Sequence, residues 1–413
     1  MIDFTVPEEV QEVMASLERF VEVEIEPLRK QHAKALANER YLYDETGAYV
    51  PEIQDALRQI RMKSAEAGFY TMFGDPELGG SGDVFGPVAV VLIHEMLMKK
   101  YGLDLFVQSI FPPGLFTGGL TPVLLGMKEE LREQLLPRIA SGEALLCFGL
   151  SEPDAGSDVW NIKTRAVKDG DHWVINGTKQ WITNSPYADY ALIFAVTNPE
   201  LAAQRRGGIT CFLVPFDGKT CQNTSVIPYL GSLGSRIGII TLENARVPES
   251  HIIGDLDDAF GKALHGVDIG RLVMAANCVG AAQWVLNKAI DYSLERKAFG
   301  GPIADQQAIQ MMLADCAMDI YAARYMTLHC AWKLETQKTL PIKEISMVKA
   351  FTTEMAQRVA DRCMQIHGGM GLTNELGLEA VWRWARSMRI PDGTSEIQRR
   401  TVARRLLKGD RNF

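Results

Sequence analysis

The 413-residue chain lacks the short motifs that mark several common enzyme classes. It has no P-loop and no GxSxG nucleophile elbow, and its seven histidines show no HxxxH or HExxH spacing. The glycine-rich stretch Gly79–Gly86 follows no buried strand, so it does not indicate a Rossmann site. We therefore expect no P-loop nucleotidase, no serine hydrolase of the elbow type and no metal site.

The chain also lacks the marks of secretion and of membrane insertion. Its seven cysteines are odd in number and form no CxxC pair, which favours unpaired thiols in a reducing compartment. The start MIDFTVPEEV is acidic and resembles neither a signal peptide nor an Arg-rich transit peptide. Apolar runs such as Pro87–Ile93 are far shorter than the ~20 residues of a membrane helix. These features predict a cytoplasmic protein that is not bound to a membrane.

Positive charge is in deficit, since the net charge is -8 and the pI is near 5.5. This argues against a generally nucleic-acid-binding surface, although the tract Arg383–Arg411 is rich in arginine. The length exceeds the roughly 250–300 residues at which single cores stop growing. We expect two or three domains.

The period of the hydrophobic pattern changes twice along the chain, which predicts three domains at residues 1–146, 147–257 and 258–413. The first and last show helical periodicity. The expected helices are Glu9–Glu24, Pro51–Glu66, Pro87–Lys99, Lys128–Ile139, Leu264–Arg296, Asp305–Thr336 and Ile342–His367. Helices as long as the last three suggest a bundle with some faces reserved for other subunits.

The middle part carries strand signals and predicts a compact antiparallel β domain. The stretch His172–Thr183 contains Asn176-Gly177 between two β-rich runs, which predicts a hairpin turn at that dipeptide. Further strands are expected at Ala191–Val196, Ile209–Phe216 and Gly238–Leu242. The chain thus reads as helical bundle, β domain, helical bundle.

Five motifs suit a flat heterocycle and its phosphates, although each alone also fits an ordinary turn, cap or core residue. LSEPDAGSD (Leu150–Asp158) offers hydroxyls and backbone N–H groups from a loop of small residues. KQWITNS puts Trp181 and Thr183 on one face of a strand. LERKAFG ends a helix with Arg296, QIHGGMG is glycine-rich beyond the need of a cap, and IPDGTSEIQRR reads as a turn with Thr394 or Ser395 as the next N-cap.

Taken together and in this order, the five motifs resemble those of the acyl-CoA dehydrogenase family, from about Glu8 to Leu407. The resemblance implies an α+β multi-domain fold with an N-terminal α-helical bundle, a middle antiparallel β-barrel or sandwich and a C-terminal four-helix bundle. It also implies FAD as cofactor. The residues that match the family's cofactor positions are Phe148, Leu150, Ser151, Gly156, Ser157, Trp181, Ile182, Thr183, Arg296, Phe299, Gln307, Gln365, Ile366, His367, Gly368, Gly369, Thr394 and Glu396.

The resemblance further implies α,β-dehydrogenation of an acyl-CoA to the 2-enoyl-CoA, with Asp392 as the base that removes the α-proton and with hydride passing to flavin N5. The positions that match substrate contacts are Ser157, Asp268, Arg271 and Gly393. Family members stabilise the enolate through a ribityl hydroxyl and the backbone N–H of the base residue, which Asp392 retains. Expected partners are the acyl-CoA, electron-transfer flavoprotein and further copies of the chain, as a tetramer or dimer that shares its FAD sites. Fatty acid metabolism is the implied setting.

The base itself departs from the family, which usually carries Glu where Asp392 stands; a minority place a Glu at the position of Gly270. Asp reaches about 1.5 Å less than Glu. Among relatives, Asp accompanies alicyclic, hydroxylated or long acyl groups, so we expect a bulky, branched or cyclic substrate. Burial should raise the pKa of Asp392.

Two alternative functions remain open. In the first, the protein is a flavin oxidase of the same fold, like the nitroalkane oxidases. In the second, it is a non-catalytic relative that binds nucleic acid through its Arg-rich C-terminal tract. In LGSLGSRIG the arginine comes later than the family's Gly-Xaa-Arg-Gly pattern has it. Arg205, Arg206 and Arg236 are therefore candidates for CoA phosphate contacts, and equally for solvated surface arginines.

Overall fold

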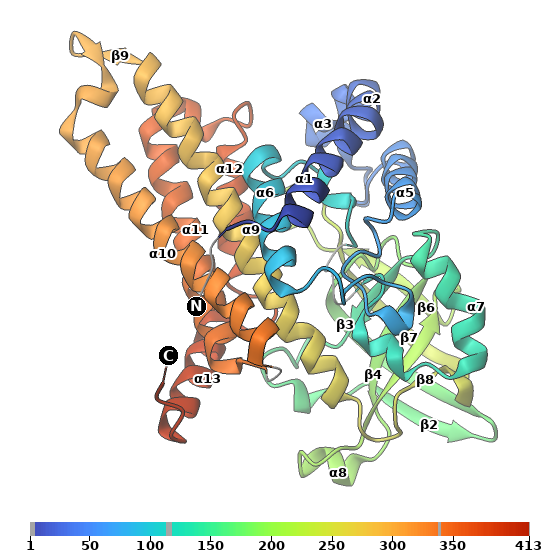
Figure 1. Cartoon of the computed structure of the whole chain (residues 1–413). Helices are drawn as coiled ribbons and strands as arrows, with labels where there is room; N and C mark the ends of the chain where they lie inside the picture. Colours follow the sequence, from blue (N-terminus) through green and yellow to red (C-terminus); the bar gives the residue numbers. More distant parts are fainter. Residues whose placement is uncertain (1–4, 113–117, 338–339, 413) are drawn as a thin grey trace. The chain divides into compact units, whose positions relative to one another are not determined.

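The computed structural model of the protein describes residues 5–112, 118–337 and 340–412. Packing divides the chain into two compact units, each formed by segments that lie far apart in the sequence (Figure 1). We call residues 5–18, 85–107 and 268–412 the helical unit, and residues 19–84 and 108–267 the sheet unit. Two helices cross a boundary in sequence, α1 (Glu8–Phe20) and α9 (Phe260–Glu295).

The helical unit is built around the long helix α11, which packs against its neighbours α10, α12 and α13. Besides parts of α1 and α9, the regular elements of this unit are α6 (Pro87–Tyr101), β9 (Lys297–Ala298), β10 (Gly301–Pro302), α10 (Gln307–Gln337), α11 (Ile342–His367), α12 (Leu378–Met388) and α13 (Ser395–Leu407). A shared core joins Met98 of α6 to Val285, Ile320 and Val359 of the three long helices. The segment 85–107 therefore belongs by packing to the C-terminal helices.

One stretch of α9, Gly266–Glu295, is long and apolar enough to cross a membrane by length and composition alone. Of its most apolar window, 61% is buried inside the protein. A buried apolar helix is the expected centre of a helical core, so this stretch is weak evidence for a membrane span.

The sheet unit combines short helices with one twisted sheet. Its helices are α2 (Glu26–Gln31), α3 (Ala33–Ala37), α4 (Glu39–Leu42), α5 (Pro51–Glu66), α7 (Glu129–Ala140) and α8 (Pro199–Ala203). Its strands are β1 (Leu146–Gly149), β2 (Arg165–Asp169), β3 (His172–Thr183), β4 (Tyr190–Val196), β5 (Ile209–Pro215), β6 (Cys221–Val226), β7 (Ile237–Pro248) and β8 (Ile252–Ile253).

In the part of the chain that the structure describes, these strands form one eight-stranded sheet in the order β6-β7-β3-β2-β4-β5-β8, and β1 pairs with β4. The prediction of a purely antiparallel sheet is wrong in two places, because β1 and β2 both run parallel to β4. Parallel neighbours need long connections, and here residues 150–189 connect β1 to β4 and residues 170–189 connect β2 to β4. Apolar residues of the strands, such as Ile193 and Phe212, form one buried core cluster.

The predicted hairpin at Asn176-Gly177 is also wrong, because β3 continues through this dipeptide as a single strand. The register against β7 shifts between Ile175 and Gly177, which marks a β-bulge. A Cβ on Gly177 would lie 2.4 Å from Thr164 Oγ1, so glycine is needed here for close approach. The actual turn between β2 and β3 falls at Gly170, which has a positive φ of 64°.

The helical predictions fare better where the sequence carries its own start signal. Helix α5 spans Pro51–Glu66 as predicted, with Pro51 in its first turn. The predicted helix Glu9–Glu24 is regular only to Phe20 and continues as a π-helical stretch over Val21–Ile25. The domain boundaries after residues 146 and 257 stay predictions.

Candidate active site

The turn between α12 and α13 presents Asp392 in a strained backbone conformation. Asp392 has φ +55° and Gly393 has φ +89°, both in the left-handed region that non-glycine residues avoid. Thr394 is the N-cap of α13, as predicted, because its hydroxyl accepts the N–H of Ile397 at 3.3 Å. Strain of this kind persists only where the surroundings hold it in place.

Three side chains hold this turn by its carbonyl groups. Arg271 Nε donates to the Asp392 carbonyl at 2.7 Å, and Lys349 Nζ donates to the Gly393 carbonyl at 2.9 Å. The amide of Gln398 donates to both carbonyls at 3.0 Å. Lys349 lies on α11 and is fully buried, so its ammonium group faces this turn and not solvent. The backbone is thereby fixed without using the carboxylate.

The Asp392 carboxylate and its backbone N–H both remain available for a ligand. Within the described residues, no hydrogen bond is donated to the carboxylate oxygens, and the Asp392 N–H donates to no carbonyl. Burial raises the pKa of Asp392 above its ordinary value, although the charges of Arg271 and Lys349 oppose the rise. A proton acceptor and a backbone donor thus sit on one residue.

Gly270 of α9 faces this carboxylate. A Cβ built on Gly270 would lie 3.9 Å from Asp392 Oδ2, so the missing side chain leaves room beside the acid. The same turn of α9 also carries the ion pair between Asp268 and Arg271. Arg271 therefore supports the turn directly and Asp268 acts through Arg271, while their predicted contacts with substrate stay predictions.

A second group of predicted residues lines a groove of about 510 Å³ in the helical unit. The lining includes the predicted residues Arg296, Gln365, Ile366, His367, Gly368 and Gly369. His367 is fixed in place, since its Nδ1 donates to the Cys363 carbonyl at 2.7 Å and its ring stacks on Tyr292 at 4.4 Å. One guanidinium beside bare glycine backbone suits a phosphate-bearing ligand.

The glycines of this groove have different reasons to be glycine. Gly368 has φ +57°. Gly369 has no positive φ, and a Cβ there would meet nothing within 4 Å. By contrast, a Cβ on Gly371 would lie 2.4 Å from the Met364 carbonyl oxygen. The fold itself therefore needs glycine at 371 but not at 369, which is open for a ligand to approach.

Other predicted residues of the helical unit are less engaged. Phe299 is 94% exposed with φ +53°, and Gln307 starts α10 with its side chain exposed. Neither lines the groove at Arg296. Glu396 is exposed in the first turn of α13, next to the cap Thr394.

In the sheet unit, the predicted LSEPDAGSD loop is anchored by an ion pair that sequence reasoning missed. Lys179 of β3 donates to Glu152 at 2.7 Å and to the Leu150 carbonyl at 3.2 Å. The two side chains are only 0% and 5% exposed. Burial lowers the pKa of Lys179 to about 8, against the opposing charge of Glu152. The Glu152 carboxylate also accepts the N–H groups of Lys163 and Thr164.

The predicted residues of this loop are placed by that anchor. Phe148 and Leu150 are partly buried beside the core, and the backbone carbonyl of Ser151 accepts the N–H of Gln180 at 2.9 Å. Gly156 and Ser157 are exposed, and a Cβ on Gly156 would meet nothing within 4 Å. The loop therefore presents small, accessible groups.

Trp181 has a strained backbone conformation and an exposed side chain, so the alternative that it is a core residue is wrong. Register shifts against β7 between Lys179 and Ile182, and Trp181 in the bulge has φ +65°. Trp181 is 55% exposed and Thr183 is exposed, whereas Ile182 between them is buried. An exposed indole beside a hydroxyl is a suitable surface for a planar ligand.

Of the missed residues Glu152, Lys179, Lys349 and Gln398, Lys349 carried a weak signal, because it is a charge within the apolar run Met347–Phe351 of α11. No local spacing links Lys179 to a loop that lies 27 residues earlier. Three-dimensional placement was needed to join them.

Comparison with known proteins settles the family. The model described as acyl-CoA dehydrogenase, middle domain, matches residues 147–245, and that of the C-terminal domain matches residues 260–407. Probable acyl-CoA dehydrogenase YngJ of Bacillus subtilis is 37% identical over 98% of this chain and 100% of its own length. Caffeyl-CoA reductase-Etf complex subunit CarC of Acetobacterium woodii is 34% identical over 88% of this chain and 92% of its own.

Solved structures agree with these relatives. The structure of a putative acyl-CoA dehydrogenase from Mycobacterium abscessus is 29% identical, with a TM-score of 0.85 over 98% of this chain and 99% of its own. A structure described as the FAD complex of PigA is 25% identical, with a TM-score of 0.83 over 99% and 100% of the two chains. The chain belongs to the acyl-CoA dehydrogenase family and has its fold of helical end domains and a middle β domain. It is an oxidoreductase.

Proposed function

We propose that the protein catalyses FAD-dependent α,β-dehydrogenation of an acyl-CoA thioester, with Asp392 as the base. The observation that carries this proposal is the turn at Asp392, whose backbone is held by Arg271, Lys349 and Gln398 while its carboxylate and N–H stay free. Family membership supplies the reaction class. FAD is the cofactor, and when bound it accepts the β-hydrogen as a hydride.

The residues present fit an FAD molecule. The groove at Arg296 and His367 offers a guanidinium and open glycine backbone at Gly369 for phosphate oxygens. In the sheet unit, Trp181 and Thr183 offer an exposed indole and a hydroxyl for a flat ring. Arg296, His367, Gly369, Trp181 and Thr183 are all among the residues predicted from the motifs.

The chain's own part in the chemistry is to move one proton and to stabilise one oxyanion. The ionised carboxylate of Asp392 takes the α-proton of the thioester, and its raised pKa makes it a stronger base than an ordinary aspartate. The Asp392 N–H is free to donate to the thioester oxygen as negative charge develops there. Arg271 and Lys349 hold the backbone conformation in which Asp392 carries both groups.

For the substrate, we propose a bulky, branched or cyclic acyl group. The shorter reach of Asp than of Glu and the bare Gly270 opposite it leave additional space beside the base. Relatives carry names that include 3-(aryl)acrylate reductase of Clostridium sporogenes and cyclohexane-1-carbonyl-CoA dehydrogenase of Geobacter metallireducens, at 33% and 31% identity. Those names agree with a ring-bearing substrate.

We further propose electron-transfer flavoprotein as the electron acceptor, since one relative is named as a subunit of a reductase-Etf complex. The assembly is a homo-oligomer that shares FAD sites, and the setting is cytoplasmic fatty acid or related acyl-CoA metabolism. The ion pairs of the Arg-rich tract Arg383–Arg411 argue against nucleic acid binding by this tract. Arg383 pairs with Glu379, and Arg389 and Arg399 both pair with Glu354, so part of the tract's positive charge is already engaged within the protein.

An anaerobic titration tests the reaction and the substrate class together. The purified yellow protein is mixed with straight, branched, aromatic and alicyclic acyl-CoAs while flavin absorbance is recorded. We expect bleaching, fastest with the bulky esters, and little peroxide when the reduced protein meets air. Rapid peroxide formation would favour an oxidase, and no bleaching by any ester would contradict the proposal.

A further inference from the structure

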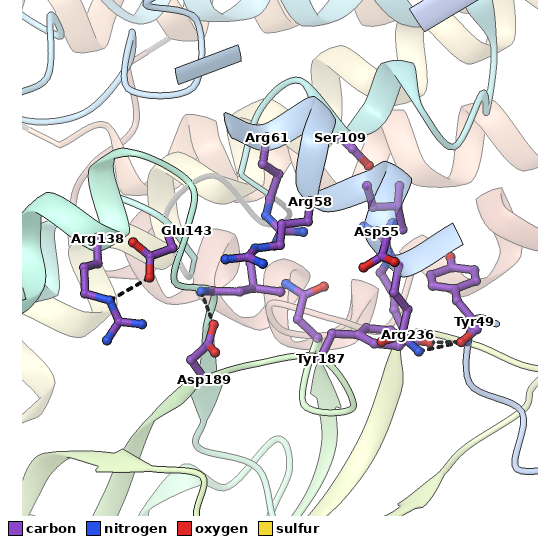
Figure 2. Close-up of a pocket in the computed structure, with 14 residues that line it drawn as sticks. Tyr49, Asp55, Arg58, Arg61, Ser109, Arg138, Glu143, Tyr187, Asp189 and Arg236 are labelled. Carbon is purple, nitrogen blue, oxygen red and sulfur yellow. Dashed lines mark hydrogen bonds and ion pairs between the residues drawn. The ribbon is translucent and has the colours of Figure 1, made fainter. Parts of the chain in front are cut away.

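A cavity of about 310 Å³ lies wholly within the sheet unit, apart from every residue assigned above to the base or the cofactor (Figure 2). Helix α5 forms one wall, and the segments around Tyr187 and Arg236 form another. The volume falls at the lower end of the roughly 300–1,000 Å³ typical of ligand pockets. The cavity is therefore large enough for a small organic anion.

The lining of this cavity holds four arginines and three carboxylates, but the charges are not paired evenly. Arg138 pairs with Glu143 at 3.1 Å. Among the described residues, no ion pair joins Arg58, Arg61 or Arg236 to any carboxylate. The Asp189 carboxylate accepts the N–H of Leu145 at 2.8 Å, so it already has a partner.

The three unpaired guanidinium groups face one space. Arg58 and Arg61 stand one turn apart on α5, so their side chains share a face of the helix. Figure 2 shows them reaching from α5 toward the region bounded by Arg236 and Tyr49 on one side and Arg138 on the other. The lining sets two carboxylates, Asp55 and Asp189, against these three positive charges, so the cavity keeps one excess positive charge that an anion would neutralise.

Neighbouring groups hold the arginines in position. Arg236 is hydrogen bonded to Tyr49, whose ring stacks on Tyr187 at 5.3 Å. The Arg236 carbonyl accepts the N–H of Asn184 at 2.6 Å. Arg61 Nε donates to the Gly142 carbonyl at 3.3 Å. Burial lowers the pKa of Arg61. Tyr70 and the Asp189 carboxylate oppose this shift, whereas the charges of Arg58 and Arg236 add to it.

We propose that this cavity binds a phosphate group, either inorganic phosphate or the phosphate of a small organic molecule, on Arg58, Arg61 and Arg236. Guanidinium groups match the planar, paired acceptor geometry of phosphate oxygens, and clusters of arginine are a recurrent way to bind phosphate. A bound phosphate would neutralise the excess charge and tie α5 to the loop before β7. This site does not depend on the function proposed for Asp392.

The test measures the thermal midpoint and the phosphate affinity of the FAD-loaded protein by thermal shift and calorimetry. Sodium phosphate is compared with sodium chloride at equal ionic strength, and then with ADP, CoA and malonate. The variants are R58Q, R61Q and R236Q. R58Q matters most for interpretation, because Arg58 is exposed and its loss should not impair folding. R246Q is the matched control, since Arg246 is a surface arginine of the same unit that pairs with Asp169 outside the cavity.

We expect phosphate to raise the midpoint of the wild type and of R246Q alike. We expect each cavity variant to bind phosphate at least about tenfold more weakly, a change of about 1.4 kcal/mol. Tighter binding of ADP or CoA, lost in the same variants, would identify an organic phosphate as the source; equal or weaker binding would identify the free ion. Stabilisation no greater than that by chloride, unchanged affinity in R58Q, or preference for malonate would overturn the proposal.

Discussion

At the scale of single residues, the account depends on how charges around the Asp392 turn set its proton affinity. The carboxylate acts as a base only when ionised, so the rate must rise with pH through its raised pKa. The positive charges of Arg271 and Lys349 ease this ionisation, and burial lowers the pKa of Lys349 itself to about 8. The protonation of Lys349 and the protonation of Asp392 therefore influence each other.

Replacing Lys349 with Met should move the acid limb of the kcat/KM profile to higher pH. Removal of a nearby positive charge disfavours the carboxylate and raises the pKa of Asp392 further. The pH profile of dye reduction measures this directly. K343M serves as control, because Lys343 is another buried lysine of α11 but pairs with Asp410 at 2.7 Å. An acid limb that stays in place in K349M would show that Lys349 does not tune the base.

Two glycines of one motif should respond in opposite ways to alanine. Gly369→Ala should leave the unfolding midpoint of the FAD-free protein unchanged, because its Cβ meets nothing. It should weaken FAD binding about tenfold or more, since the added methyl stands where the ligand approaches. Gly371→Ala should instead destabilise the fold by contact with Met364. Flavin fluorescence titration and thermal unfolding separate the effects, and a normal FAD affinity in G369A would remove Gly369 from the site.

At the scale of elements, the buried pair of Lys179 and Glu152 joins the LSEPDAGSD loop to β3 just before the bulge at Trp181. Breaking a buried pair by removing one partner commonly costs about 3–5 kcal/mol. Glu152→Gln should destabilise the sheet unit by an amount in this range, as measured by urea unfolding. Asp154→Asn in the same loop is the control, because its pair with Lys163 is exposed and should matter little. Equal stability of E152Q and the wild type would contradict the anchoring role.

How far the sequence predicted these elements depended on whether the signal was local. Pro51 and a helical apolar period were enough to place α5 to the residue. The dipeptide Asn176-Gly177 misled because Gly177 serves a close approach to Thr164, a contact invisible to local pattern. The parallel pairing of β1 with β4 and the meeting of Arg58 and Arg61 with Arg236 are likewise non-local. The motif residues themselves were found because each motif is contiguous.

At the scale of the whole molecule, one face of α10 is where we expect the proposed further copies of the chain to pack. Met311, Met318 and Tyr321 recur at helical spacing, and the last two are 63% and 67% exposed. Met318→Glu should yield smaller assemblies by light scattering and, if FAD sites are shared, less bound flavin. Gln337→Glu at the exposed end of α10 is the control. An M318E protein of unchanged size and flavin content would exclude this face.

The central claim is that Asp392 removes the α-proton, and anaerobic stopped-flow reduction of the D392N variant tests it most directly. The amide keeps the size of the side chain and the turn's carbonyl contacts to Arg271 and Lys349 but cannot act as a base. The account predicts a yellow, FAD-loaded protein reduced by its acyl-CoA about 10²–10⁴-fold more slowly than the wild type. Reduction at a near-normal rate would contradict it.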